Sequence, residues 1–152
     1  MAGGRHDNTA ITARLDDFLC FSIYAAEHAF SRAYKPLLAE IGLTYPQYLV
    51  MTVLWEEDNQ SVGQLGTKLS LESSTLTPLL KRLEADGLLA RHRDTKDERV
   101  VRVQLTIAGD KLRQRAVNIP ACILQATGMS LDELGKLRDQ ITALTKRLEK
   151  TA

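Results

Sequence analysis

Residues 61–106 have the sequence SVGQLGTKLSLESSTLTPLLKRLEADGLLARHRDTKDERVVRVQLT, in which the spacing of apolar residues changes from helical to alternating. Ser61 and Gln64 form the pattern of a capping box, which predicts the start of a short helix. Leucines at positions i, i+3, i+4 and i+7 from Leu76 predict a second short helix directly after it. From residue 88 onward, apolar and polar residues alternate on both sides of a polar turn, which predicts a β-hairpin.

Two short helices joined by a tight turn and followed by a basic hairpin form a winged helix-turn-helix, an arrangement that binds DNA. Pro78 is compatible with the second helix only if that helix begins near Ser74 or Thr75. With its leucines facing the core, the helix turns hydroxyl and basic side chains toward base edges and phosphates, and the hairpin tip fits a minor groove. The candidate DNA-contacting residues are Ser74, Thr75, Thr77, Lys81 and Arg82 on the helix and Arg91, Arg93, Lys96 and Arg99 on the hairpin. The alternative is a solvated polar turn beside an ordinary amphipathic helix.

Helices are also predicted before this region. From Leu15 onward one helix face is apolar, with Pro36 expected to kink or end the helix and Gly42 to close the segment. Residues 47–55 are apolar nearly all round, which predicts a buried helix at the centre of the fold.

The part of the chain after the hairpin is predicted to be helical as well. We expect one long helix that is capped by Thr106 and kinked at Pro120. The last helix carries apolar residues at alternating three- and four-residue spacing, the pattern of a coiled-coil seam. These seam residues are Leu134, Leu137, Ile141, Leu144 and Leu148. The architecture is therefore predicted to be mainly α with a small β-hairpin wing.

Length and composition exclude several classes of protein. A chain of 152 residues with 44% apolar and 26% charged side chains predicts one domain with a core that needs no disulfide or structural metal. Its longest uncharged stretch, residues 116–131, is shorter than the ~20 residues of a membrane-spanning helix. The three histidines are scattered and no nucleotide-binding glycine motif occurs. We therefore expect no metal, no cofactor, no membrane partner and no enzyme activity.

Charge and cysteine content add two expectations. The net charge of +1 gives no argument for nucleic acid by itself, so the prediction of DNA binding depends on local geometry. Residues 1–13 are polar and contain no apolar core of a secretion signal, so we expect a disordered tail on a cytoplasmic protein. A cell would keep the two cysteines reduced, and any disulfide is expected to be switchable rather than structural.

A polar stripe runs beside the apolar face of the first predicted helix, where Cys20, Tyr24, Glu27, Ser31 and Tyr34 recur on one side. Tyr24 lies one turn from Cys20 and can hydrogen-bond its sulfur. Tyr34 lies ~21 Å from Cys20 along the helix, at about 1.5 Å per residue. If Tyr34 contacts Cys20, it must therefore come from another chain. The alternative is that Cys20 is a small buried apolar residue and the tyrosines pack at an interface.

Residues 15–148 resemble the MarR family of dimeric winged-helix regulators, and within it the organic-hydroperoxide-sensing OhrR repressors of the two-cysteine type. The resemblance is carried by LCFSIY at 19–24, YKPLL at 34–38, LTYPQYLVMTVLWE at 43–56, LTPLLKRLEADGLL at 76–89 and DERVVRVQLTIAG at 97–109. The first three of these segments are more specific to that branch than the helix-turn-helix is.

The resemblance implies roles for the cysteines and tyrosines. Cys20 would be the residue that peroxide oxidises, and hydrogen bonds from Tyr34 and Tyr45 across the dimer, with Tyr24 nearby, would stabilise its thiolate. Cys122 matches the resolving cysteine, which condenses with the sulfenic acid to form a disulfide. The alternatives are that a small thiol resolves the sulfenic acid and that this second cysteine is an inert core residue.

The resemblance also implies how such a protein meets DNA. Asp97 and Arg99 form the D-x-R pattern of the wing, in which the aspartate orients an arginine into the minor groove. A homodimer built from the terminal helices is implied, in agreement with the seam spacing. The expected function is a repressor that binds a pseudo-palindromic operator in double-stranded DNA and releases it when an organic hydroperoxide oxidises Cys20.

We expect residues 1–13 to be a disordered tail and residues 14–152 to form a single domain. Its dimerisation helices are expected at 15–42 and 107–150, and its winged helix-turn-helix at 61–106. Two other functions fit parts of the sequence. A small phenolic ligand, rather than oxidation, could control the repressor, or the chain could be a two-cysteine thiol peroxidase, for which the wing and second helix would have no purpose.

Overall fold

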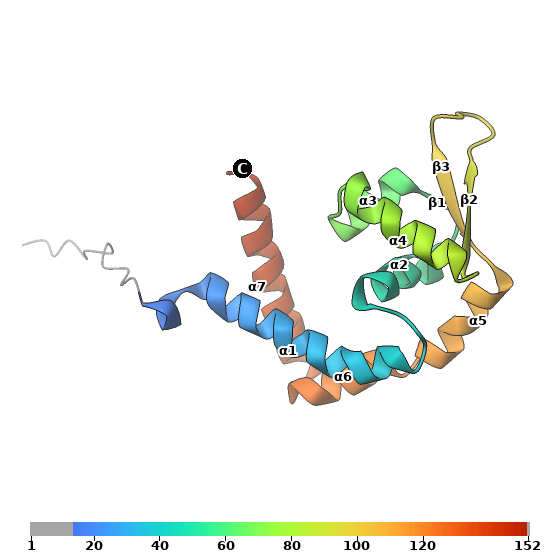
Figure 1. Cartoon of the computed structure of the whole chain (residues 1–152). Coiled ribbons are helices and arrows are strands. Elements are labelled where there is room, and N and C mark those ends of the chain that lie inside the picture. Colours follow the sequence, from blue (N-terminus) through green and yellow to red (C-terminus); the bar gives the residue numbers. More distant parts are fainter. Residues whose placement is uncertain (1–13, 152) are drawn as a thin grey trace, which may run out of the picture.

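The computed structural model describes residues 14–151, and the expectation for residues 1–13 falls outside this range. The predicted fold class is confirmed: the chain is mainly helical with one small antiparallel sheet in a winged-helix arrangement (Figure 1). The elements in chain order are the 3-10 turn η1 (Leu15–Asp17), α1 (Leu19–Ala39), α2 (Tyr45–Glu56), β1 (Gln60–Ser61), α3 (Val62–Leu69), α4 (Ser73–Ala85), β2 (Leu89–Arg93), β3 (Val101–Leu105), α5 (Ile107–Ala116), α6 (Ile119–Thr127) and α7 (Leu131–Glu149).

The helix-turn-helix is formed by α3 and α4. Both hydrogen bonds of the predicted capping box are present, since the Gln64 N–H donates to Ser61 Oγ at 3.0 Å and the Ser61 N–H donates to Gln64 Oε1 at 2.8 Å. A Cβ on Gly66 would lie 2.8 Å from the carbonyl oxygen of Leu71, so the tight turn requires glycine there. Helix α4 begins at Ser73, slightly earlier than Pro78 predicted, and therefore carries this proline in its second turn.

The predicted hairpin is confirmed as β2 and β3, which pair antiparallel with Arg91 opposite Val103. The sheet has a third strand that the sequence did not indicate, because β1 adds to β3 and gives the order β1-β3-β2. A strand of two residues is too short to show an alternating pattern.

The core surrounds α2, as predicted from its uniformly apolar sequence. Val50, Met51 and Leu54 are fully buried there, together with Leu80 of α4. The side chain of Trp55 donates a hydrogen bond from Nε1 to the backbone oxygen of Gly109 at 2.9 Å. Helix α2 is thereby packed against both α4 and α5.

The structure decides between the two outcomes expected at Pro36 and corrects the prediction of one long helix after the hairpin. Pro36 lies inside α1 and does not end it, and the segment closes at Gly42, whose φ of +70° suits glycine. The single long helix expected after the hairpin is two helices. Thr106 caps α5 as predicted, but the chain leaves that helix after Ala116, and Pro120 lies in the first turn of α6, where its missing N–H has no consequence.

Helices α1, α6 and α7 form an arm that extends away from the winged helix (Figure 1). No residue of α7 is buried, and Leu137, Ile141 and Leu148 of its apolar seam are 45%, 41% and 60% exposed. Much of this apolar seam is therefore left uncovered by the rest of residues 14–151. In that range no helix is both long and apolar enough to cross a membrane.

Candidate DNA-binding surface and cysteine site

Helix α4 turns its apolar side inward and a basic side outward. Leu76, Leu80 and Leu83 are fully buried, which fixes the orientation of the helix. The other face carries the predicted contact residues, of which all but one are exposed. The exposed residues are Ser74, Thr75, Lys81 and Arg82, and the half-buried one is Thr77. This exposed face has the chemistry to contact phosphates and base edges.

Arg99 projects from the tip of the wing and its side chain is 90% exposed. Asp97 holds it in place, since Arg99 Nε donates to Asp97 Oδ1 at 3.0 Å and Arg99 Nη2 donates to Oδ2 at 3.3 Å. These side-chain bonds, with one from the Arg99 backbone N–H, hold the pKa of Asp97 below its ordinary value. The aspartate therefore orients an otherwise free arginine, the geometry that the D-x-R pattern implies.

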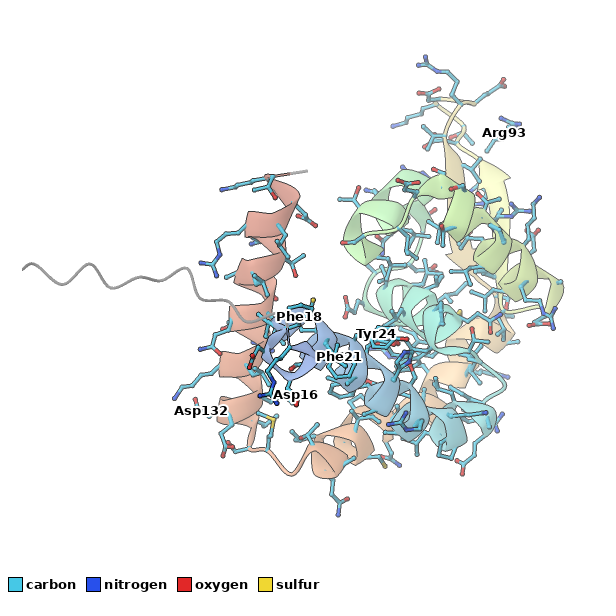
Figure 2. The ribbon with its side chains drawn as sticks, turned by 60° about the vertical axis from the view of Figure 1, so that its left-hand side comes forward. Asp16, Phe18, Phe21, Tyr24, Arg93 and Asp132 are labelled. Atoms are coloured by element: carbon cyan, nitrogen blue, oxygen red, sulfur yellow. The ribbon has the colours of Figure 1, made fainter. Side chains whose placement is uncertain are left out.

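Two other arginines of the hairpin are less free, whereas Lys96 is not. Arg91 donates from its backbone N–H and from Nη2 to the carboxylate of Glu84, at 2.9 and 3.1 Å, which ties β2 to α4. Arg93, labelled on the wing in Figure 2, donates to the backbone oxygen of Glu98 at 2.8 Å. Lys96 has an exposed side chain at the turn. Lys96 and Arg99 are thus the most available cations of the wing.

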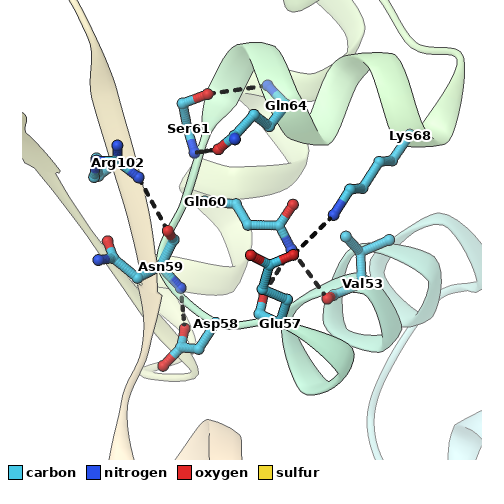
Figure 3. A network of polar contacts seen from close by, with 9 residues as sticks. All are labelled: Val53, Glu57, Asp58, Asn59, Gln60, Ser61, Gln64, Lys68 and Arg102. Atoms are coloured by element: carbon cyan, nitrogen blue, oxygen red, sulfur yellow. Dashed lines mark hydrogen bonds and ion pairs between the residues drawn. The ribbon is translucent and has the colours of Figure 1, made fainter.

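A polar network that joins the wing to the loop after α2 was not predicted. Asp94, a residue of the polar turn, accepts a hydrogen bond from Arg102 Nε at 2.8 Å, and Arg102 Nη1 donates to the backbone oxygen of Asn59 at 3.1 Å (Figure 3). Asp58 accepts from the backbone N–H of Leu105 at 2.8 Å. These partners lie 8, 43 and 47 positions apart in the sequence, so no local pattern could indicate them.

Cys20 is exposed in the first turn of α1. The first hydrogen bond into this helix is donated by the N–H of Ser22 to the carbonyl of Phe18, so the N–H groups of the preceding residues have no helical acceptor. Figure 2 labels Phe18, which directly precedes α1, and Tyr24 in the second turn, whose ring packs edge-on against His28 with centroids 4.2 Å apart. The first turn of α1, which carries Cys20, is therefore a position where a negative charge is favoured.

Cys122 is exposed near the middle of α6, and both thiols are free. Within residues 14–151 no group of three or more histidine, cysteine or acidic side chains could hold a metal ion.

Tyr34 and Tyr45 are brought together from α1 and α2, with ring centroids 4.8 Å apart. Tyr48, which sequence reasoning did not select, lies 6.0 Å from Tyr34, and its spacing of three residues from Tyr45 was the signal for it. Burial, with smaller contributions from these two neighbours, raises the pKa of Tyr34 to about 12. Burial and then the Glu27 carboxylate raise the pKa of Tyr45. Both phenols therefore remain protonated donors at neutral pH.

The tyrosine pair opens onto an apolar groove of about 610 Å³ between α1 and α7. Its walls include Ile23 and Phe30 of α1 and Leu144 of α7. Cys20 and Tyr34 are fourteen residues apart on the continuous helix α1, or ~21 Å at about 1.5 Å per residue. One chain therefore does not bring this thiol and this phenol together.

The buried leucine face of α4, the tight turn at Gly66 and the paired hairpin define the chain as a winged helix-turn-helix protein. A family model described as transcriptional regulator SarA/Rot matches residues 32–116. The HTH-type transcriptional regulator TtmR of Methylorubrum extorquens is 51% identical over 138 residues, which cover 91% of this chain and 71% of TtmR. The organic hydroperoxide resistance transcriptional regulator of Bacillus subtilis is 42% identical over 135 residues, which cover 89% of this chain and 92% of that protein.

Solved structures of AbfR from Staphylococcus epidermidis are also similar. Reduced AbfR bound to DNA matches with a TM-score of 0.75 at 36% identity, over 89% of this chain and 94% of that one. Disulfide-formed AbfR matches with a TM-score of 0.63 at 37% identity, over 87% and 93%. The chain therefore belongs to the MarR-like family of transcriptional regulators and is a DNA-binding transcriptional regulator. Its relatives are regulators and not enzymes.

Proposed function

We propose that this regulator is a homodimeric repressor of the two-cysteine OhrR branch, which releases its operator when an organic hydroperoxide oxidises Cys20. The proposal depends on the position of Cys20, which is exposed in the first turn of α1, while the far end of that helix carries Tyr34 packed against Tyr45 of α2. The Bacillus relative is an organic hydroperoxide resistance regulator, and AbfR has been solved both reduced and as a disulfide.

The homodimer is supported by the exposed apolar surface of the arm. Leu19 and Phe30 of α1 are exposed along with the α7 seam, and a twofold-related copy would cover both helices. We propose that residues 15–42 and 107–150 form this interface within a single domain of residues 14–152, leaving residues 61–106 to bind DNA. A twofold axis also lets Tyr34 and Tyr45 of one protomer approach Cys20 of its partner, which a single chain cannot do.

The proposed oxidation needs no group beyond the two cysteines and the peroxide. The Cys20 thiolate attacks one oxygen of the hydroperoxide, the O–O bond breaks, and the departing alkoxide takes up a proton as the alcohol. Cys20 becomes a sulfenic acid. The Cys122 thiol of the other protomer then attacks that sulfur, which forms a disulfide and releases water.

The tyrosines are proposed to act as hydrogen-bond donors to the thiolate. A donor must keep its proton while its partner is an anion, and the raised pKa values of Tyr34 and Tyr45 meet this requirement. Tyr24, one turn from Cys20, would add a donor from the same chain. The N-terminus of α1 would also stabilise the Cys20 thiolate.

In the reduced dimer, the two α4 helices are proposed to enter successive major grooves about 34 Å apart on a pseudo-palindromic operator, with Arg99 in the flanking minor grooves. The proposed contact residues are Ser74, Thr75, Thr77, Lys81 and Arg82 on α4 and Arg91, Arg93, Lys96, Asp97 and Arg99 on the wing. A disulfide between the dimer arms would shift α1 and α6, and the two α4 helices would no longer match this spacing.

The experiment that tests the proposal is a gel shift on the DNA upstream of the chain's own gene, with and without cumene hydroperoxide. Wild type is expected to bind when reduced and to be released by the peroxide. Cys20→Ser is expected to bind equally well and to remain bound, because serine keeps the volume but lacks the oxidisable sulfur. Release of this variant by peroxide, or release of wild type only by a phenolic ligand, would contradict oxidation at Cys20.

The resolving role of Cys122 is tested separately on a non-reducing gel. Peroxide-treated wild type is expected at twice the monomer mass, and a thiol reductant is expected to reverse the crosslink. Cys122→Ser is expected to stay at monomer mass while a sulfenic-acid probe still labels Cys20. Peptide mapping that finds free Cys122 in oxidised wild type would replace this step with capping by a small thiol.

A further inference from the structure

The wing carries an acidic residue, Asp94, whose carboxylate is bonded to other groups of the protein rather than exposed to solvent. The side chain of Asp94 is only 14% exposed. Its Oδ1 accepts the backbone N–H of Lys96 at 2.7 Å and its Oδ2 accepts Arg102 Nε at 2.8 Å. The Asp94 backbone N–H closes the turn on the carbonyl of Val100, also at 2.8 Å. One carboxylate thus shapes the turn and anchors it to β3.

Arg102 continues this anchor to the body of the domain. Its Nη1 donates to the carbonyl of Asn59 at 3.1 Å, in the loop between α2 and β1 (Figure 3). Asn59 has a φ of +56°, and its N–H is held at 2.8 Å by Asp58 Oδ1. The same oxygen accepts the N–H of Leu105 at 2.8 Å, so the loop and strand β3 are joined at two points. The wing turn is therefore tied to the end of α2.

Arg102 and Arg99 differ in exposure and in hydrogen bonding, and this difference indicates different roles. Arg102 is 33% exposed and uses both Nε and Nη1 on protein acceptors, whereas Arg99 is 90% exposed and bonded only to Asp97. A guanidinium whose Nε and Nη1 groups both donate to protein acceptors has few N–H groups available for a phosphate. A guanidinium that is bonded to one carboxylate and otherwise exposed can contact DNA.

We infer that Asp94 and Arg102 are positioning residues for DNA recognition, which fix the wing turn to the loop after α2 and so hold Arg99 where it meets the minor groove. This inference rests on the wing contact in the proposed function. A carboxylate next to DNA phosphates is electrostatically unfavourable unless it has a structural task. The direction of the effect of removing its charge therefore distinguishes positioning from simple repulsion.

The test compares Asp94→Asn with the matched control Glu98→Gln. Glu98 lies on the same turn, its side chain is exposed, and within residues 14–151 that side chain makes no hydrogen bond or ion pair. Each variant removes one negative charge from the wing. Asparagine at position 94 places either a donor or an uncharged acceptor against Arg102 and loses the charge-assisted bond. The measurement is fluorescence anisotropy with a labelled duplex of the chain's own upstream DNA and with a scrambled duplex.

The inference predicts that Asp94→Asn weakens binding to the upstream duplex by about fivefold or more, the lower end of losing a minor-groove arginine. Glu98→Gln is expected to bind as wild type does or more tightly. Equal or tighter binding by Asp94→Asn would overturn the inference. A loss of the same size on the scrambled duplex, accompanied by a lower melting temperature, would also overturn it, because it would indicate general unfolding.

A double-mutant cycle with Arg99→Ala completes the test. If Asp94 acts through Arg99, Asp94→Asn should cause no further loss in the Arg99→Ala background, whereas additive losses would overturn the inference. If Arg99→Ala alone binds the duplex as wild type does, the wing contact of the proposed function fails, and the statement that Asp94 acts through Arg99 fails with it. A loss in Arg99→Ala without one in Asp94→Asn refutes only the positioning role.

Discussion

Truncating one residue of the α7 seam tests whether this surface forms the dimer interface. Ile141 is 41% exposed in the single chain. Ile141→Ala removes three carbon atoms, each worth about 0.8 kcal/mol when fully buried. If a partner covers the exposed part, the loss is about 1 kcal/mol for each protomer. Because twofold symmetry makes the change count twice, the dimer is expected to lose about 2 kcal/mol.

This loss corresponds to a dimer dissociation constant raised about 30-fold. Sedimentation velocity over a concentration series measures that constant directly. Gln104→Ala is the control, because Gln104 is exposed on β3, outside the helices proposed to form the interface. The control is expected to associate as wild type does. An unchanged constant for Ile141→Ala, or a wild type that stays monomeric at micromolar concentration, would refute the assignment of the seam to the interface.

Three further outcomes follow from other parts of the structure. Gly109→Ala should destabilise the fold by about 3 kcal/mol or more in urea unfolding, because its Cβ would overlap the carbonyl oxygen of Leu88; an unchanged midpoint would contradict this packing. Tyr34→Phe should slow thiol oxidation by cumene hydroperoxide about tenfold in stopped-flow measurements, the loss of one charge-assisted donor, and an unchanged rate would remove Tyr34 from the site. The side-chain hydrogen bond from Arg91 lowers the pKa of Glu84 from 4.5, so its stabilising contribution should be present above pH 4.5 and be lost as the pH falls through the lowered value. Glu84→Gln should flatten this acid dependence of the unfolding midpoint, and an equally steep curve would count against the pair.

The elements that the sequence predicted correctly depend on contacts between near neighbours. The capping box at Ser61 joins residues three apart, and the leucines that orient α4 repeat every three or four positions. The hairpin follows from alternation within nineteen residues. Such patterns are visible in a single sequence because the hydrogen bond or the buried face is made by the segment itself. They were sufficient to predict the winged helix and its outward-facing basic residues.

The sequence was least decisive at prolines, because a proline in a helical segment can either kink the helix or end it. Pro120 indicated an interruption, but whether the chain would kink or start a new helix depended on how α5 and α6 pack. Pro36 was expected to kink or end α1, and the helix continues past it. In both cases proline removes one N–H, and the surrounding packing decides whether the helix continues past it.

Local patterns in the sequence were enough to predict helix α4, the hairpin, the buried helix α2 and a stripe on α1 that contains Cys20, Tyr24 and Tyr34. Which charged residues are free depends on contacts between distant segments, since Arg91 is bound to Glu84, Arg102 to Asp94, and Arg99 projects outward. The packing of the helices likewise brings Tyr34 against Tyr45 of another helix and leaves the α7 seam open. The physical reason is that a side chain's partner is set by which distant segments fold against it, and that distance in sequence leaves no periodic trace.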